Sequence, residues 1–258
     1  MSDLSIRVIS GVIGIIALIA IMITGGLILK LALMILSIVA LFEFYKAISK
    51  IDLKPLMIVG YLSSILFLSS LFFEKITVDL IFTVLMILSL SITVFGNKFS
   101  IKDVAATFIG ILYIPFLLYH LIYLDGTKFM WLVFIIAFGT DTFAYLVGTK
   151  FGRHKLCPHI SPKKSVEGAI GGILGSIVLS VIYGVFFEIE PLWSLGLMAL
   201  VGSIISQIGD LTASRIKRLV GIKDFGKLMP GHGGALDRFD SIIFAAPFVY
   251  YYAYLFLK

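Results

Sequence analysis

The side chains best suited to chemistry gather in one stretch near the C-terminus, SRIKRLVGIKDFGKLMPGHGGALDRFDS, at 214–241. This stretch contains six Lys or Arg, three Asp, one His and five Gly. Carboxylates in such a setting can hold a divalent cation, and basic groups can neutralise phosphate oxygens that gain charge during group transfer. The stretch therefore predicts a site for a triphosphate with Mg²⁺. The sequence has no GxxxxGK[ST] pattern, so the chain is not a P-loop enzyme.

A carboxylate lies just before this stretch, in SQIGDLTASRIKR at 206–218. Asp210, Ser214 and Lys217 are spaced i, i+4 and i+7, so they share one face of a helix, with Arg218 beside it. This spacing offers a metal ligand and a phosphate clamp on a rigid element. The alternative is that Lys217 and Arg218 only extend toward the membrane surface, as interfacial bases do. Asp210 favours the functional interpretation.

The end of the stretch has a second pair of carboxylates, Asp237 and Asp240, at i and i+3 on the expected first turn of the last helix. Two acids on one face near a helix start can bind a divalent cation, or they can simply cap the helix. Gly233 and Gly234 precede them and let the backbone approach a ligand closely, as in phosphate loops. His232 is a candidate donor to phosphate, although a lone His is more often structural.

A second basic region, KFGRHKLCPHISPKKSVEGAIGG, occupies 150–172. Lys163 and Lys164 precede a helix that Ser165 is expected to cap, and helix-start amides with two ammonium groups form an anion site. Glu167 adds a carboxylate that could hold a metal or orient a lysine. The alternative is an ordinary basic cytoplasmic loop, followed by glycines that pack one helix against another.

Asp141 lies in the middle of an apolar helical segment, FIIAFGTDTFAYLVGTKFG. A charged Asp inside a bilayer costs about 2.5–3.5 kcal/mol, so it is expected to face a cavity or a partner. We therefore expect Asp141 to line a polar substrate pocket, with a single interhelical hydrogen bond as the alternative.

The composition defines the setting of these residues. The chain has 258 residues, of which 60% are hydrophobic and only 14% charged, and its mean hydropathy is +1.09. A soluble core could not hide that much apolar surface, and several uncharged runs come close to or exceed the roughly 18 residues that indicate a transmembrane helix. The net charge of +6 is explained by basic cytoplasmic loops, without nucleic acid.

The sequence predicts an all-α, polytopic integral membrane protein with about nine transmembrane helices. Gly25 and Gly26 are expected to break the first apolar run into two helices. With a cytoplasmic N-terminus, 17 of the 21 basic residues fall on the inner side. The expected helices span about 8–24, 27–46, 56–73, 77–96, 101–124, 129–150, 166–187, 191–218 and 238–257.

The chain is expected to divide by role. Residues 1–100 form N-terminal transmembrane helices with short loops. Residues 101–258 form the catalytic half, because glycines, ionisable groups and basic cytoplasmic loops accumulate there.

The stretch at 214–241 resembles the signature of the phosphatidate cytidylyltransferase family, also called CDP-diacylglycerol synthases. The pattern is S-x-x-K-R-x4-K-D-x4-[apolar]-P-G-H-G-G-x-x-D-R-x-D. The residues that match it are Ser214, Lys217, Arg218, Lys223, Asp224, Pro230, His232, Gly233, Gly234, Asp237, Arg238 and Asp240. CPHISPKKSVEGAIGG and DTFAYLVG also resemble family segments, so the resemblance is strong over about 137–241.

The resemblance implies an all-helical membrane enzyme that converts CTP and phosphatidic acid into CDP-diacylglycerol and pyrophosphate. It also implies a homodimer in the cell (inner) membrane, with Mg²⁺ as cofactor, K⁺ as a candidate second cation and an active site that faces the cytoplasm. The family's metal ligands correspond to Asp210 and Asp237, the pair that helix spacing also selects.

We expect an oxygen of the lipid phosphate to attack the α-phosphorus of CTP without a protein nucleophile. Lys217, Arg218, Lys223 and Arg238 are expected to neutralise the phosphates, and Asp224 and Asp240 to orient these bases or add to the metal shell. Lys163 and Lys164 are expected to bind the second phosphate substrate. The alternatives are a CTP-dependent lipid or polyprenol kinase, a CDP-lipid synthase for an ether lipid, and an ion-coupled secondary transporter that uses Asp141.

Overall fold

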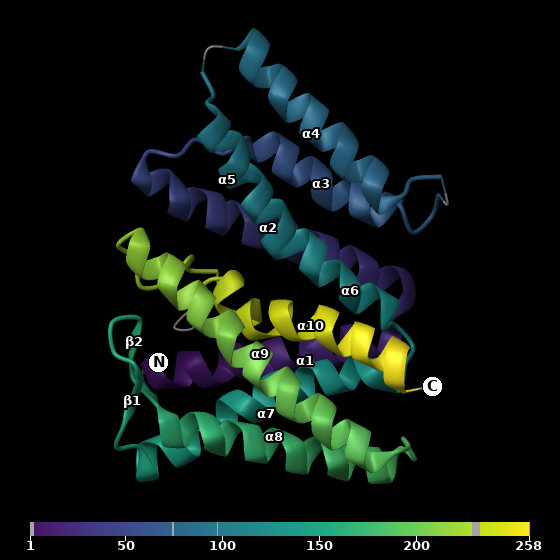
Figure 1. The fold of residues 1–258 in the computed structure, drawn as a ribbon, viewed down its shortest axis with the longest axis vertical. Helices are drawn as coiled ribbons and strands as arrows, with labels where there is room; N and C mark the ends of the chain where they lie inside the picture. Colours follow the sequence, from purple (N-terminus) through teal and green to yellow (C-terminus); the bar gives the residue numbers. More distant parts are fainter. Residues whose placement is uncertain (1–2, 74, 97, 229–232, 258) are drawn as a thin grey trace. The chain divides into compact units, whose positions relative to one another are not determined.

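Figure 1 shows the computed structural model of the chain, which describes residues 3–73, 75–96, 98–228 and 233–257, with side chains from residue 10 onward. Two strands, β1 (Lys155–Cys157) and β2 (Ser161–Ser165), form a short antiparallel hairpin. The helices are α1 (Asp3–Thr24), α2 (Gly26–Ile48), η1 (Ser49–Ile51), α3 (Met57–Ser69), α4 (Val78–Phe95), α5 (Ile101–Ile111), η2 (Leu112–Phe116), α6 (Leu117–Tyr123), α7 (Lys128–Phe151), α8 (Val166–Phe186), α9 (Leu192–Leu219) and α10 (Leu236–Phe256).

The predicted all-α membrane fold is confirmed, because seven of the described helices are long and apolar enough to cross a bilayer. Two shorter apolar helices, Ser10–Thr24 and Met57–Ser69, complete the nine expected segments. The number of spans and the side of the N-terminus stay predictions. The expected break between the first two helices is confirmed, and Gly25 and Gly26 adopt positive φ angles of 56° and 53° there.

One expected helix is interrupted. The sequence predicts a continuous helix over 101–124, but the described segment changes from α5 to a π-helical turn, η2, before it resumes as α6. Pro115 lies inside η2 and has no backbone N–H to donate to the preceding turn. A π-type turn accommodates this loss.

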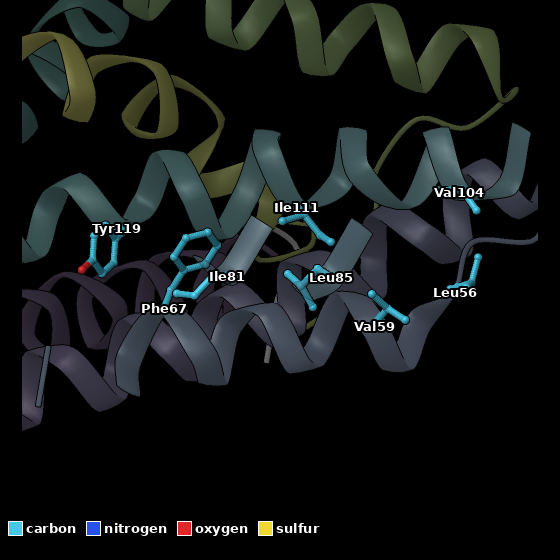
Figure 2. Close-up of a cluster of buried hydrophobic side chains, with 8 residues drawn as sticks. All are labelled: Leu56, Val59, Phe67, Ile81, Leu85, Val104, Ile111 and Tyr119. Atoms are coloured by element: carbon cyan, nitrogen blue, oxygen red, sulfur yellow. The ribbon is translucent and has the colours of Figure 1, made fainter. Parts of the chain in front are cut away.

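The chain forms two compact units: Met1–Ile122 with Val220–Arg238, and Tyr123–Leu219 with Phe239–Lys258. In the first unit, apolar side chains from α3, α4, α5 and α6 form a buried core (Figure 2). Its members are Leu56, Val59, Phe67, Ile81, Leu85, Val104, Ile111 and Tyr119. The expected division by role at residue 100 is a separate matter, which these units do not test.

Tyr45 fixes α2 within the first unit. Its ring is fully buried, and its hydroxyl donates a hydrogen bond to the backbone oxygen of Thr107 in α5, at 2.9 Å. A Cβ at Gly60 in α3 or at Gly110 in α5 would overlap this ring. The two glycines therefore create the space for Tyr45, and α2 is held in a defined position by α3 and α5.

The second unit depends on close packing of α7 against α8, which run side by side (Figure 1). A Cβ at Gly172 would lie 2.7 Å from the backbone oxygen of Thr140, and a Cβ at Gly168 would lie 3.0 Å from the Cα of Gly148. The predicted small-residue packing face of α8 is confirmed. This contact brings the hairpin before α8 next to the helix that carries Asp141.

Candidate active site

In the second unit, Asp210 is the centre of a polar cluster at the hairpin. Lys164 of β2 forms an ion pair with Asp210 of α9, and the Ser214 hydroxyl donates to Asp210 Oδ1 at 3.4 Å. Arg218 Nε donates to the backbone oxygen of Ile160 in the hairpin turn, at 3.2 Å. The hairpin is therefore attached to α9 at two points two turns apart.

The helix spacing predicted for α9 is confirmed, because Asp210, Ser214 and Lys217 all lie within its 28 residues. Lys217 is only 9% exposed, which is unusual for a lysine and requires compensating charge. The carboxyl group of Asp240 in α10 supplies it, since Asp240 interacts electrostatically with both Lys217 and Asp210. Opposite charges thus gather on the inner faces of α9 and α10.

Gly209 allows this approach of α9 to α10. A Cβ at Gly209 would lie 2.6 Å from the backbone oxygen of Asp240 and 3.0 Å from the Cβ of Phe244. Any larger residue would push the two helices apart. The glycine directly before Asp210 therefore sets its proximity to Asp240, which lies one turn after Asp237 in α10.

Asp141 lies in the middle of α7, as predicted, and also interacts electrostatically with Asp240. The hydroxyl of Ser241 in α10 donates to Asp141 Oδ2 at 3.5 Å, a long hydrogen bond. Asp141 is exposed on the surface of the chain, so its predicted place in a substrate pocket stays a prediction. The cluster thus contains carboxylates from α7, α9 and α10.

The predicted cap of α8 is confirmed, because the Ser165 hydroxyl accepts a hydrogen bond from the Gly168 backbone N–H at 3.1 Å. Glu167 is committed to the hairpin. Its carboxylate accepts hydrogen bonds from the Arg153 N–H at 3.0 Å and from the His154 N–H at 3.2 Å, and it pairs with the His154 ring at 2.6 Å. Glu167 therefore orients the start of the hairpin. Lys163 is exposed.

In the first unit, Asp237 closes the loop that leads into α10. Its Oδ2 accepts hydrogen bonds from the backbone N–H of Phe225 at 2.8 Å and of Gly234 at 3.0 Å. Gly233 has a φ of 89°, where a side chain would be strained, and a Cβ there would lie 3.0 Å from Asp237 Oδ2. Lys223, Asp224 and Arg238 are exposed, whereas His232 lies outside the described residues.

Glu43 of α2 holds the same loop from the other side. It is 5% exposed, and its two oxygens accept hydrogen bonds from the backbone N–H of Ala235 at 3.0 Å and of Leu236 at 2.9 Å. A Cβ at Gly226 or Gly234 would overlap its carboxylate. A buried carboxylate thus binds the start of α10 and forces the loop glycines to pack against it.

Comparison with known proteins follows from this geometry. A profile of the family described as "Cytidylyltransferase family" matches residues 5–256. Three relatives, each named phosphatidate cytidylyltransferase, come from Staphylococcus epidermidis, with 35% identity, and from Staphylococcus saprophyticus and Staphylococcus aureus, each with 34% identity. Each alignment covers 95% of this chain and 96% of the relative. The chain belongs to the cytidylyltransferase family.

Family membership confirms the resemblance, while the residue roles stay predictions. Asp210 and Asp240 come together with Lys164, Ser214 and Lys217 in the second unit. Asp237 belongs to the first unit, so its convergence with Asp210 stays a prediction. Among the described residues, no three His, Cys, Asp or Glu side chains gather to form a metal site.

Sequence reasoning about this cytidylyltransferase missed Glu43. The available signal was the carboxylate itself, because Glu43 lies in the apolar segment ALFEFYKAI. Ionisable residues within membrane helices are functional by default, with a partner to be named. That partner could not be inferred, because it is backbone nearly 200 residues further along the chain.

Proposed function

We propose that this cytidylyltransferase family member is an enzyme that transfers the cytidylyl group of CTP to phosphatidic acid and yields CDP-diacylglycerol and pyrophosphate. The observation that carries the proposal is the match over residues 5–256, together with relatives of nearly equal length named phosphatidate cytidylyltransferase. The multi-pass membrane fold fits a lipid substrate, because the enzyme and the lipid share one phase.

The proposed reaction is a single displacement. A phosphate oxygen of phosphatidic acid forms a bond to the α-phosphorus of CTP, while the bond from that phosphorus to the oxygen bridging to the β-phosphate breaks. Pyrophosphate leaves with that bonding pair. The protein's contribution to such a transfer is positioning and charge neutralisation rather than covalent chemistry.

The residues of the α9 cluster suit this task. Lys217 is buried among carboxylates, and Lys164 is held by Asp210, so both ammonium groups have fixed positions. Fixed cations in a poorly solvated site stabilise developing phosphate charge without reorganising. Ser214 and Asp240 orient them. Arg218 in addition fixes the hairpin that carries Lys163 and Lys164.

The donor chemistry fits Mg²⁺. This ion prefers oxygen ligands and is usually held by one or two carboxylates plus substrate phosphates, so a cage of three protein acids is not required. The carboxylates predicted to hold it are Asp210 and Asp237, and Asp237 has one oxygen engaged with backbone N–H groups. When bound, Mg²⁺ would neutralise phosphate oxygens and favour the departure of pyrophosphate.

Three further features are part of the proposal: a homodimer, K⁺ as an accompanying cation and an active site that faces the cytoplasm. The cytoplasmic orientation is supported by the basic residues of the 150–172 and 214–241 segments, which the positive-inside rule places on that side. A cytoplasmic site gives access to soluble CTP while the lipid stays in the inner leaflet.

The test is product analysis with the full-length protein purified in detergent and supplied with Mg²⁺, phosphatidic acid and CTP labelled in the cytosine ring. We expect labelled CDP-diacylglycerol and one pyrophosphate per turnover. Labelled CDP, with transfer of phosphate to a lipid, would instead identify a lipid kinase and contradict the proposal. Reactions with dCTP, with ATP and without lipid serve as controls for nucleotide and acceptor specificity.

A further inference from the structure

A cavity of about 530 Å³ lies between the end of α2 and the segment 222–227, entirely within the first unit. Lys46 and Lys50 line one side, and Asp224, Phe225 and Lys227 line the other. Its volume falls within the range of about 300–1,000 Å³ that small-molecule sites occupy. The cavity is therefore large enough for a nucleotide or a phospholipid headgroup.

The charges around this cavity favour an anion. Three lysines, Lys46, Lys50 and Lys227, face a single carboxylate, Asp224. The ion pairs between described residues, His154 with Glu167 and Lys164 with Asp210, include none of these lysines. A concave surface with an excess of one sign concentrates ligands of the opposite sign. An acyl chain would gain nothing from it, whereas phosphate oxygens would.

The α2 wall is rigid because the same helix face holds the loop. Glu43, Lys46 and Lys50 are spaced i, i+3 and i+7, so they lie along one side of α2 and continue into η1. Glu43 binds the backbone of Ala235 and Leu236 and packs against Gly226, which belongs to the opposite wall. The contact that anchors the loop thereby sets the separation of the two walls.

The loop wall is also joined to a predicted metal ligand. Phe225 lines the cavity, and its backbone N–H donates to Asp237 Oδ2 at 2.8 Å. A phosphate held in the cavity would therefore lie against the same segment that positions Asp237. This link connects the cavity to the chemistry proposed above, although Lys46 and Lys50 lie far outside the 214–241 stretch.

We propose that this cavity is a binding site for a phosphate-bearing substrate or product, with phosphoryl oxygens held by Lys46, Lys50 and Lys227. The anion is either the oligophosphate of the nucleotide, including released pyrophosphate, or the phosphate of the acidic lipid. The identity of these anions rests on the proposed function, whereas the existence of the site rests on the cavity and its charges.

Calorimetric titration of the full-length protein in detergent tests the site with two probes, inorganic pyrophosphate and dioctanoyl phosphatidic acid. Loss of two charge-assisted contacts in Lys46→Gln/Lys50→Gln should weaken binding of one probe by about tenfold or more. The probe that is affected identifies the source of the phosphate. Lys102→Gln, which changes an exposed lysine of α5 outside the cavity, should bind both probes as the unaltered protein does.

Lys227→Gln provides an independent variant from the loop wall and should weaken binding of the same probe. Size-exclusion chromatography and thermal melting establish that each variant is folded. Binding of both probes with unchanged affinity in folded variants, or binding of neither probe by the unaltered protein, would overturn the proposed site.

Kinetics separate this proposal from the proposed function. In an active enzyme, the double variant should raise the KM for CTP or for phosphatidic acid, matching the probe affected in the titration. If the unaltered protein makes no CDP-diacylglycerol, the proposed function fails, but the pyrophosphate and lipid titrations still decide whether the cavity binds phosphate.

Discussion

At the scale of single residues, Asp237 combines a structural contact with a predicted catalytic one. Its Oδ2 accepts two backbone hydrogen bonds, and its charge is predicted to hold Mg²⁺. Asp237→Asn separates these roles, because an asparagine keeps one oxygen that can accept both hydrogen bonds. We expect turnover to fall by about a hundredfold or more, since a metal ligand supports several kcal/mol of transition-state stabilisation.

The measurement is the initial rate of CDP-diacylglycerol formation from labelled CTP, with folding checked by size-exclusion chromatography. Asp52→Asn is the matched control, because Asp52 is an exposed carboxylate in a turn with a φ of 60°, a conformation that Asn adopts readily. Near-normal turnover in folded Asp237→Asn would refute the metal role.

The sequence was sufficient to group Asp210, Ser214 and Lys217, because helical periodicity places residues at i, i+4 and i+7 on one face. It was not sufficient to pair Asp210 with Lys164 or Asp240 with Lys217. Those partners come from other elements, and their approach depends on how Gly209 lets α9 meet α10. Residue spacing predicts a shared face but not what the face meets.

At the scale of elements, α2 positions the loop before α10 through Glu43. In Glu43→Gln, the side-chain amide keeps one acceptor oxygen but directs an NH₂ group at the second backbone N–H. One buried donor then lacks a partner, which costs about 1–3 kcal/mol. We expect a lower melting temperature and, because the loop also carries Asp237, a several-fold higher Mg²⁺ concentration for half-maximal activity.

The Mg²⁺ requirement distinguishes positioning from stability alone. Activity is measured against Mg²⁺ concentration at a temperature where the variant remains folded. Glu188→Gln, at an exposed glutamate of the second unit, is the control and should change neither quantity. A lower melting temperature with an unaltered Mg²⁺ requirement would show that Glu43 only stabilises the fold.

Local signals predicted the elements well where the cause was local. The Gly25–Gly26 break and the Ser165 cap both follow from neighbouring residues. The hairpin at 155–165 was not predicted, because its strands are short and owe their orientation to Arg218 and Glu167. The π-turn at Pro115 was not predicted either, since a proline can also kink or end a helix.

At the scale of the whole molecule, hydropathy and loop charge together predict the topology. Apolar length identifies the helices, but only the uneven distribution of Lys and Arg assigns their sides. Family membership adds the reaction but not the orientation. The side on which the basic hairpin lies is therefore the property that decides whether soluble CTP can reach the lysines of that hairpin.

The single cysteine, Cys157, allows a direct test because it lies in β1 of that hairpin and is partly exposed. A membrane-impermeant maleimide should label it in inverted vesicles but not in intact cells. A cysteine introduced by Lys75→Cys in a Cys157→Ser background should give the opposite result, since three predicted spans separate the two positions. Labelling of both positions from one side would contradict the span count, and exchange of the two results would place the N-terminus outside. The expected pattern would place the hairpin on the cytoplasmic side, because basic loops are retained there during insertion.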